Sequence, residues 1–594
     1  MTGLADFDFK PIKSAVTAFF GCWALQQISG ITVRNPLTVV FFVVLFWMAL
    51  VQDKIRPYLI SISAAYGIGM TFMLRNRITA GFDSKLFKLM SIVIVLCGMV
   101  CTCYILVGFA ISVFSGQKRN DALQLVRKMF LDTKSSFTGT RVVLIIASLC
   151  FACWFPYFLY EYPGIMTADS LVQYAEFFGV EPVSNHHPIV HTLLIKFFCD
   201  IATLFHKDHQ IGIALYTLFQ MIFMAICCGV LVTHIRARKL QILATMFYAL
   251  VPFNGVFVVT VWKDIIFAGI TMLLLCCVID LRESYSKGNS DEGECSDNRT
   301  TLIWFTFAVL GILFALFRSN AWYAFIVWTP FLLITFKKDI KRATCAALIV
   351  LVSVFIIKGP VMRNAGVAQP DMVESLAVPV QQTARMLVDD RHLEPKDQEL
   401  IDKVIDTTYI KELYAPDFAD NIKELVRAGH PEEIENNKSE YFRMYLRMNA
   451  SNPGESIKAW YDLNGGYINP DVSYRVGDMD GIMGNEFGLF WDPKIGGKIV
   501  VKLREIGMKL GDFVPLYGLL WSIGTYTWLL VIATGICIYK RQGILCKLLL
   551  LMQVGTLVIA APMVDFRYGY SIVMTMPLWL LYYLGKETEY GTAD

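Results

Sequence analysis

Apolar runs close to the length of a membrane-spanning helix recur along this chain, for example at residues 141–160, 211–235 and 514–539. A helix needs about 20 apolar residues to cross a hydrocarbon layer of about 30 Å, and lipid offers no hydrogen-bond partners to irregular backbone. The composition agrees, since 55% of the residues are hydrophobic and only 17% are charged. We therefore expect a mainly α, polytopic transmembrane helical bundle with roughly a dozen helices that cross the membrane or lie on it.

The charges favour a membrane protein over a nucleic-acid-binding one. The formal net charge of +3 is too small to indicate a nucleic acid partner, and no nucleic-acid motif is visible. Residues 1–13 lack a cleavable signal pattern, so we expect the first apolar segments to stay in the membrane.

Lys and Arg gather in short loops that we predict to be cytoplasmic. These loops contain Lys118, Arg119, Arg127 and Lys128, then Arg236, Arg238 and Lys239, then Lys337, Lys338, Lys341 and Arg342, and finally Lys540 and Arg541.

These loops fix the direction of each crossing. Residues 141–160 run outward, and residues 211–235 must return the chain to the cytoplasmic side. The segment 187–205 between them therefore does not cross, and its amphipathic pattern predicts a helix lying at the outer interface. The later crossings are predicted at 240–262, 264–281, 302–317, 321–336, 343–357, 514–539, 544–564 and 568–584. The number of helices before residue 116 stays open.

We divide the chain into N-terminal membrane helices (1–115), a membrane core (116–357) with an external loop (161–210), an external domain (358–513) and C-terminal membrane helices (514–594). The external domain is charged and contains none of the fifteen cysteines, so no disulfide is expected there. Its helical patterns and Gly and Pro punctuation predict a mixed or helical domain folded in water. It is either a structural cap, or a domain that binds an acceptor or covers an active site.

On this topology a set of polar residues falls at one outer membrane level. Ionisable groups near the ends of apolar helices are costly unless they face a cavity and pair, so they indicate a functional site. The set comprises Asp169, Asn185, His186, His187, Lys263, Asp264, Arg318, Asp565 and Arg567.

Each of these residues also has a purely structural interpretation. Asp169 begins an amphipathic stretch and is a helix N-cap, a general base or both. His187 and His191 have the i, i+4 spacing of metal ligands, but histidines that only hydrogen-bond are at least as plausible. Lys263 and Asp264, like Arg318 and Arg567, fit charged side chains that reach from helix ends to water.

At these positions the sequence resembles the GT-C superfamily of membrane glycosyltransferases. That family places a catalytic acidic residue in the first long external loop, which Asp169 in Tyr-Pro-Gly-Ile-Met-Thr-Ala-Asp matches. The protein-mannosyltransferase branch has a His-Pro motif opening an external juxtamembrane helix, which His187-Pro188 resembles. Asp264 in Trp-Lys-Asp stands where such families carry a second acidic residue. Together with Asn-His-His-Pro, Arg-Ser-Asn and Asp-Phe-Arg-Tyr, the motifs look like a bacterial branch of DUF6020 type over residues 140–585.

The resemblance implies a bacterial plasma-membrane enzyme that moves a sugar from a polyprenyl-phosphate carrier to a glycan or polymer acceptor on the external face. It implies inversion, with Asp169 as general base and Asp264 assisting. Lys263, Arg318, Arg567, His186, His187 and Asn185 would bind substrate. A divalent metal held by Asp169, Asp264 and His187 stays open, as do the sugar and acceptor. The alternatives are a transporter or flippase of a lipid-linked saccharide and a non-catalytic anchor.

Overall fold

The computed structural model describes residues 9–31, 34–52, 56–114, 121–130, 136–287, 293–472, 479–540 and 543–586. Throughout these ranges the regular structure is helical, apart from isolated β-bridges between pairs of residues. Seven helices are long and apolar enough to cross a membrane, or eight when one bent pair counts as a single span. They are α5 (Lys85–Phe114), α7 (Thr140–Tyr160), α10 (His209–Thr233), α13 (Lys263–Lys287), α14 (Gly293–Phe317), α16 (Ile340–Ile356) and α26 (Ile523–Lys540). The predicted multi-span α architecture is confirmed.

The segment that we expected not to cross forms α9 (Ile189–Leu204), which is absent from the candidate spans among the described residues. It begins directly after Pro188 and packs against α8 (Ala168–Phe178) and α10. Lys196 and Asp200 form an exposed ion pair on its outer face, with Nζ and Oδ2 2.7 Å apart. The helix is thus amphipathic as predicted, while its position at the membrane interface stays a prediction.

The crossing predicted at residues 240–262 is broken. The structure contains α11 (Arg238–Leu250) and α12 (Pro252–Val258), and the two helices are bent by 58° relative to each other. The bend falls at Val251, whose extended backbone is the conformation favoured before a proline. The crossing predicted for this segment therefore corresponds to a bent pair of helices, and whether the pair spans the membrane stays a prediction.

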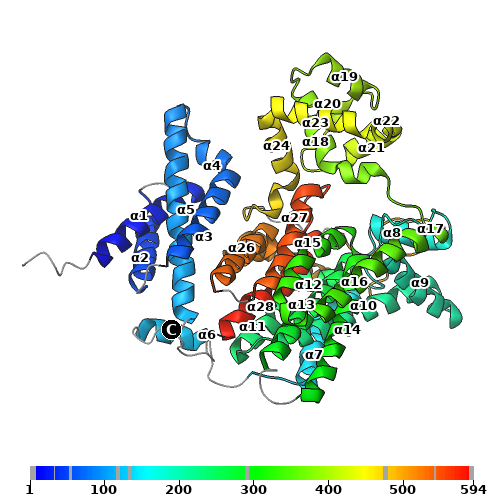
Figure 1. The fold of residues 1–594 in the computed structure, drawn as a ribbon, viewed down its shortest axis with the longest axis horizontal. Helices are drawn as coiled ribbons and strands as arrows, with labels where there is room; N and C mark the ends of the chain where they lie inside the picture. Colours follow the sequence, from blue (N-terminus) through cyan, green and yellow to red (C-terminus); the bar gives the residue numbers. More distant parts are fainter. Residues whose placement is uncertain are drawn as a thin grey trace, which may run out of the picture.

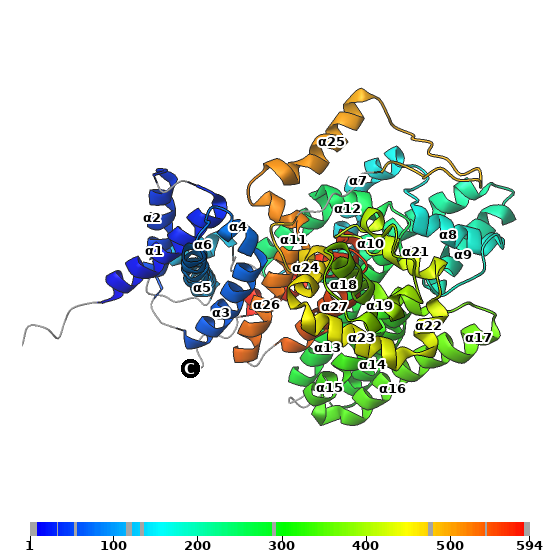
Figure 2. The ribbon, with the colours of Figure 1, turned by 90° about the horizontal axis from the view of Figure 1, so that it is seen from above.

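The N-terminal helices pack mainly on one another and stand to one side of the remaining bundle, as Figure 1 and Figure 2 show. They contact the bundle through α26, where the Tyr58 and Tyr539 rings stack with centroids 3.8 Å apart. Besides α5 they comprise α1 (Lys10–Ser29), α2 (Leu37–Leu50), α3 (Pro57–Met73), α4 (Arg75–Thr79) and α6 (Asp121–Phe130).

Helix α13 lies at the centre of the main bundle. Its span is apolar on every side and 89% buried, because α10, α14 and α28 (Phe566–Lys586) all pack against it. Two shorter helices, α15 (Ser319–Thr335) and α27 (Ile544–Ala560), pack on each other beside this core. Since α13 is held from several sides, its N-terminal residues are fixed in space.

The part of the external segment that folds as a unit is helical rather than mixed, and it has its own apolar core. It extends from α16 through a π-helical turn that contains Pro360, and most of its helices lie above the bundle in Figure 1. The Trp460 indole donates to the Val558 carbonyl at 2.9 Å, which ties the unit to α27. Its helices are α17 (Met362–Asn364), η3 (Met372–Leu376), α18 (Ala377–Val388), α19 (Pro395–Asp402), α20 (Ile410–Leu413), α21 (Asp420–Ala428), α22 (Pro431–Asn436), α23 (Lys438–Ser451) and α24 (Pro453–Asn464).

The described residues between η4 (Gly465–Tyr467) and α25 (Lys498–Phe513), 468–472 and 479–497, form no helix, and η5 (Tyr517–Trp521) leads into α26. Helix α25 carries no buried residue and exposes an apolar stripe. The described cysteines are all free. Lys118, Arg119 and Arg541, which entered the orientation prediction, lie outside the described residues, and the predicted orientation and domain boundaries remain predictions.

Candidate functional site

The short segment between α7 and α8 is pinned by backbone hydrogen bonds on both sides. The Ile165 amide donates to the Val259 carbonyl at 2.9 Å, and the Met166 amide donates to the Gly481 carbonyl at 3.1 Å. Gly164 has a φ of +148°, and a Cβ there would lie 2.4 Å from the Thr217 hydroxyl oxygen. Only glycine fits this approach. The segment therefore delivers the start of α8 to a defined place.

Thr167 is the N-cap of α8, and it forms a capping box with Ser170. The interpretation of Asp169 as the N-cap is therefore wrong. Its side chain lies in the first helical turn and is free to reach across the bundle. The Trp262 indole donates to the Thr167 hydroxyl at 2.8 Å, which joins this turn to the start of α13.

Asp169 is paired with Arg567 at the start of α28. The Arg567 Nη1 atom lies 2.7 Å from the Asp169 Oδ2 atom, and its Nε atom lies 2.8 Å from the Asp565 Oδ2 atom. The guanidinium also lies over the rings of Trp262 and Tyr568, at 4.9 and 5.0 Å from their centroids. One arginine thus bridges two carboxylates between two aromatic faces.

A second buried pair lies beside the first. Asp264 is only 1% exposed and pairs with the Arg318 guanidinium, which lies 4.8 Å from the Tyr568 ring centroid. The second oxygen of Asp264, Oδ2, is buried and has no hydrogen-bond partner among the described residues. The Tyr568 ring therefore lies beside both arginines, and both acidic candidates interact electrostatically with Lys263.

Lys263 is the cation of this cluster that has no carboxylate partner. Its Nζ atom lies 3.1 Å from the His187 Nδ1 atom, and no ion pair of Lys263 is found within 4 Å among the described residues. Its charge interacts with those of Asp169, Asp264, Arg318 and Arg567. An ammonium can only donate, so it can offer its remaining hydrogens to an incoming anion.

Burial and neighbouring charges set the ionisation of the groups outside the spans. Burial alone would raise the pKa of Asp169, but Arg567 and Lys263 hold this pKa well below its usual range. Burial, reinforced by Lys263, lowers the pKa of His187 to about 3. Asp169 is therefore an anion and His187 a neutral imidazole at pH 7.

Two predicted site residues point elsewhere. His186 is half-exposed and lies 3.7 Å from Glu374 of η3, while the Asn185 amide nitrogen donates to the Gln369 side chain at 3.4 Å. Both therefore join the site loop to the external domain.

His191 is fully buried and bonds Gln173 and Tyr216 at 2.9 and 2.7 Å. Its two ring nitrogens are therefore both engaged by these partners, so the i, i+4 metal pair with His187 does not form in the described structure.

No group of three His, Cys, Asp or Glu side chains is arranged to hold a metal in the part of the chain that the structure describes. The three residues considered as ligands instead pair with cations: Asp169 with Arg567, Asp264 with Arg318 and His187 with Lys263.

An apolar groove of about 410 Å³ is lined by residues that lie close in sequence to members of the polar cluster. Its walls begin within a turn of the cluster, since Phe317 precedes Arg318, Ile266 follows Asp264 by two residues, and Val190 follows His187 by three. Several wall residues, including Leu193 and Phe197, are exposed on the outer surface of the bundle. The remaining walls are formed by Leu194, Phe219, Phe223, Ile270, Leu273, Leu310 and Leu313.

Sequence reasoning missed this groove, as well as a buried ionic cluster at the end of α7. Glu161 is fully buried, with its Oε1 atom 2.9 Å from the Arg504 Nη2 atom, and Arg504 also lies 2.7 Å from Asp480. The Gly481 amide donates to the other Glu161 oxygen at 2.8 Å. A glutamate directly after an apolar span was the available signal.

A family described as "Family of unknown function (DUF6020)" matches residues 180–490, just over half of the 594-residue chain. The matched range includes His187, Lys263, Asp264 and Arg318, while Asp169 and Arg567 lie outside it. No curated protein and no solved structure matches the chain.

Proposed function

The chain belongs to the DUF6020 family, whose function is unknown, and from its site we propose that it is a GT-C-like membrane glycosyltransferase. It would move a sugar from a polyprenyl-phosphate carrier to a glycan or polymer acceptor of the cell envelope. The observation that carries the proposal is a buried acid-base cluster next to an apolar groove, with one lysine, Lys263, that pairs with no carboxylate in the described ranges.

The two parts of the site match the two parts of such a donor. A prenyl chain is apolar and suits the groove, whose α13 wall from Ile266 to Leu273 extends about 10 Å along the helix. The phosphate of the carrier would then lie near Lys263, where a buried cation interacts more strongly than in water. Arg318 and Arg567 supply further positive charge, although both are engaged with carboxylates in this structure.

The chemistry follows from the charges that develop. The acceptor hydroxyl oxygen forms a bond to the anomeric carbon, and the bond from that carbon to the phosphate oxygen breaks with its electron pair. The departing phosphate becomes more negative, which Lys263 stabilises. The hydroxyl proton passes to Asp169, an anion at pH 7 that is about one third exposed. A single displacement of this kind inverts the anomeric centre.

Asp264 has a positioning role in this scheme rather than the assisting catalytic one that the sequence suggested. It is nearly inaccessible and holds Arg318, while Asp169 is the more exposed carboxylate. An acceptor can therefore approach Asp169 more readily than Asp264.

The transporter alternative rests on the broken pair α11–α12, because discontinuous helices often form transport sites. It predicts polar groups along the pathway, whereas the described cluster gathers at one end of α13. We therefore rank it second.

Asp169→Asn tests the proposal. In cells that lack the native protein, this variant should lower labelled-sugar incorporation into the envelope by about 100-fold or more, the usual scale for losing a general base. Purified Asp169→Asn in nanodiscs should still bind farnesyl phosphate. Asp200→Asn, which breaks an exposed pair on α9, is the matched control. Full sugar transfer by Asp169→Asn would rule out Asp169 as the general base. Failure of the native protein to bind farnesyl phosphate would rule out a polyprenyl-phosphate donor.

A further inference from the structure

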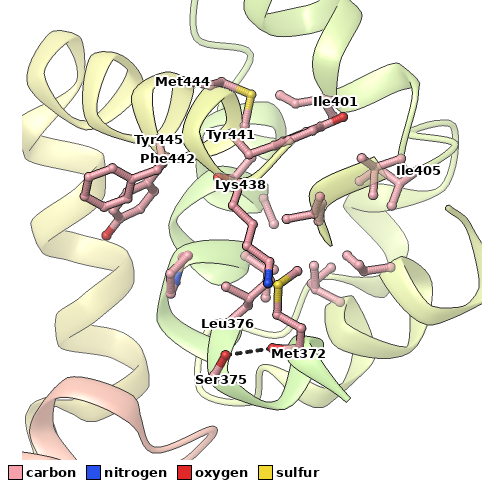
Figure 3. Close-up of a pocket in the computed structure, with 18 of the residues that line it drawn as sticks. Met372, Ser375, Leu376, Ile401, Ile405, Lys438, Tyr441, Phe442, Met444 and Tyr445 are labelled. Atoms are coloured by element: carbon pink, nitrogen blue, oxygen red, sulfur yellow. Dashed lines mark hydrogen bonds between the residues drawn. The ribbon is translucent and has the colours of Figure 1, made fainter. Parts of the chain in front are cut away.

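The core of the external helical domain is incompletely filled. A cavity of about 560 Å³ opens among α18, α19, α21 and α23. Figure 3 shows its lining, in which apolar side chains from different helices face a common space. The inner wall includes Ala384, Leu387, Ile401, Ile405, Val426 and Met444.

An apolar cavity of this size is unusual unless something occupies it. Protein interiors pack as densely as organic crystals, and an unfilled space forfeits dispersion contacts along its walls. Water gains little there because it needs several polar partners, whereas small apolar molecules enter even much smaller dry cavities. The volume is within the range of roughly 300–1,000 Å³ of small-molecule sites.

The mouth of the cavity carries a positive charge. Lys438, the first residue of α23, lines the cavity and makes no ion pair among the described residues. Figure 3 shows its side chain extending toward Met372 and Ser375 on η3. Ser439 adds a hydroxyl to that of Ser375 in the lining, and Phe442, which is 60% exposed, adds an apolar side chain. The depth is therefore apolar and the entrance cationic.

We propose that this cavity binds an anionic amphiphile, with its hydrocarbon chain among the core side chains and its head group on Lys438. A fatty acid and a prenyl phosphate share this chemistry. The site is separate from the groove beside Lys263, and the proposal does not depend on the proposed transferase activity.

The cavity wall also touches the loop that carries the candidate site. Met372, Ser375 and Leu376 of η3 line the cavity, while Glu374 of the same turn lies 3.7 Å from His186. Glu374 is held in addition by Lys423, at 2.8 Å. An occupant of the cavity therefore rests on the structural element that joins the external domain to the His186-His187 loop.

The test uses the full chain in nanodiscs and a palmitate analogue with a diazirine near the end of its chain. Irradiation should label peptides within residues 372–445, identified by mass spectrometry. Unlabelled palmitate and farnesyl phosphate are compared with hexadecanol and farnesol, which have the same chains without charge. Whichever anion competes better than its own alcohol identifies the source of the ligand.

Lys438→Gln separates charge from packing. It should abolish the advantage of the anion over the alcohol, which we expect to be about three- to fivefold for an exposed charge pair. Lys458→Gln, on an exposed lysine of the same domain away from the cavity, should keep that advantage. Ala384→Leu should reduce labelling by filling the cavity.

Labelling confined to the membrane helices would overturn the proposal. So would equal competition by anions and alcohols in the native protein, or an unchanged preference in Lys438→Gln. Lys438 is exposed at the start of α23, so Lys438→Gln should fold normally. The test therefore remains decisive even if Ala384→Leu does not fold.

Discussion

The Arg567 guanidinium lies 2.7 Å from the Asp169 carboxylate, although the two residues are 398 positions apart in the chain. The same side chain reaches Asp565, so one buried cation offsets the negative charges of two partly exposed carboxylates. Removing one partner of an ion pair in a low-dielectric environment destabilises the fold, because the remaining charge is left uncompensated. The pair therefore connects the fold of the site to its chemistry.

Arg567→Gln should destabilise the protein by about 2 kcal/mol, less than the loss for a fully buried pair, because Arg567 is mostly buried but its two carboxylate partners are partly exposed. Asp169→Asn in the same chain should recover part of the loss, since it removes one of the stranded carboxylates. Thermal unfolding in detergent measures both effects. Arg77→Gln is the control, because its pair with Asp471 has a similar 2.8 Å distance but is half-exposed. Equal losses for the two arginines would contradict the buried-pair argument.

Lys263→Gln should weaken farnesyl phosphate binding by about tenfold or more, because it removes a charge-assisted hydrogen bond from a buried position. Lys263→Arg should retain part of the affinity. Binding is measured by calorimetry in nanodiscs, with Lys196→Gln as an exposed control outside the cluster. Unchanged affinity in Lys263→Gln would place the phosphate elsewhere.

Leu313→Trp should obstruct the groove beside the cluster. Affinity for a long-chain prenyl phosphate should fall by about tenfold, equivalent to about 1.4 kcal/mol, while geranyl phosphate should bind almost as before. Ile334→Trp places the same ring at a 70% exposed position of α15 and should change neither. Equal losses of affinity for both chain lengths would show that the groove does not bind the prenyl chain.

Much of this organisation could be predicted because a membrane-spanning helix is recognisable from the hydropathy of its own short segment. The predicted crossing at 141–160 corresponds to α7 and that at 211–235 to α10, with ends within two residues. Placing polar residues at one outer level also anticipated that Asp169, Lys263, Asp264, Arg318 and Arg567 would lie together. Hydropathy and loop charge depend on short stretches of chain, which a single sequence contains.

What could not be predicted depends on tertiary geometry. His186 and Asn185 stand next to His187 in sequence, yet they turn toward the external domain, and only the packing of η3 on this loop decides that. The groove is assembled from four helices, so no single segment shows it. The bend at Val251 had a local signal in Pro252, but a proline within an apolar run does not by itself reveal a 58° change of direction.

Glu161 makes the stability of the fold depend on pH. Burial raises its pKa to about 7 from 4.5, against the opposing charge of Arg504. Between these values the folded chain keeps a proton that the unfolded chain has lost, so the contribution of Glu161 to stability is fully present below about pH 4.5 and is lost as the pH rises toward 7. The change is up to about 3 kcal/mol, at 1.36 kcal/mol for each pKa unit. Glu161→Gln should remove this fall in melting temperature between pH 5 and 7.5, whereas Glu505→Gln, an exposed neighbour of Arg504 on α25, should keep it. A slope that persists unchanged in Glu161→Gln would assign the dependence to another group.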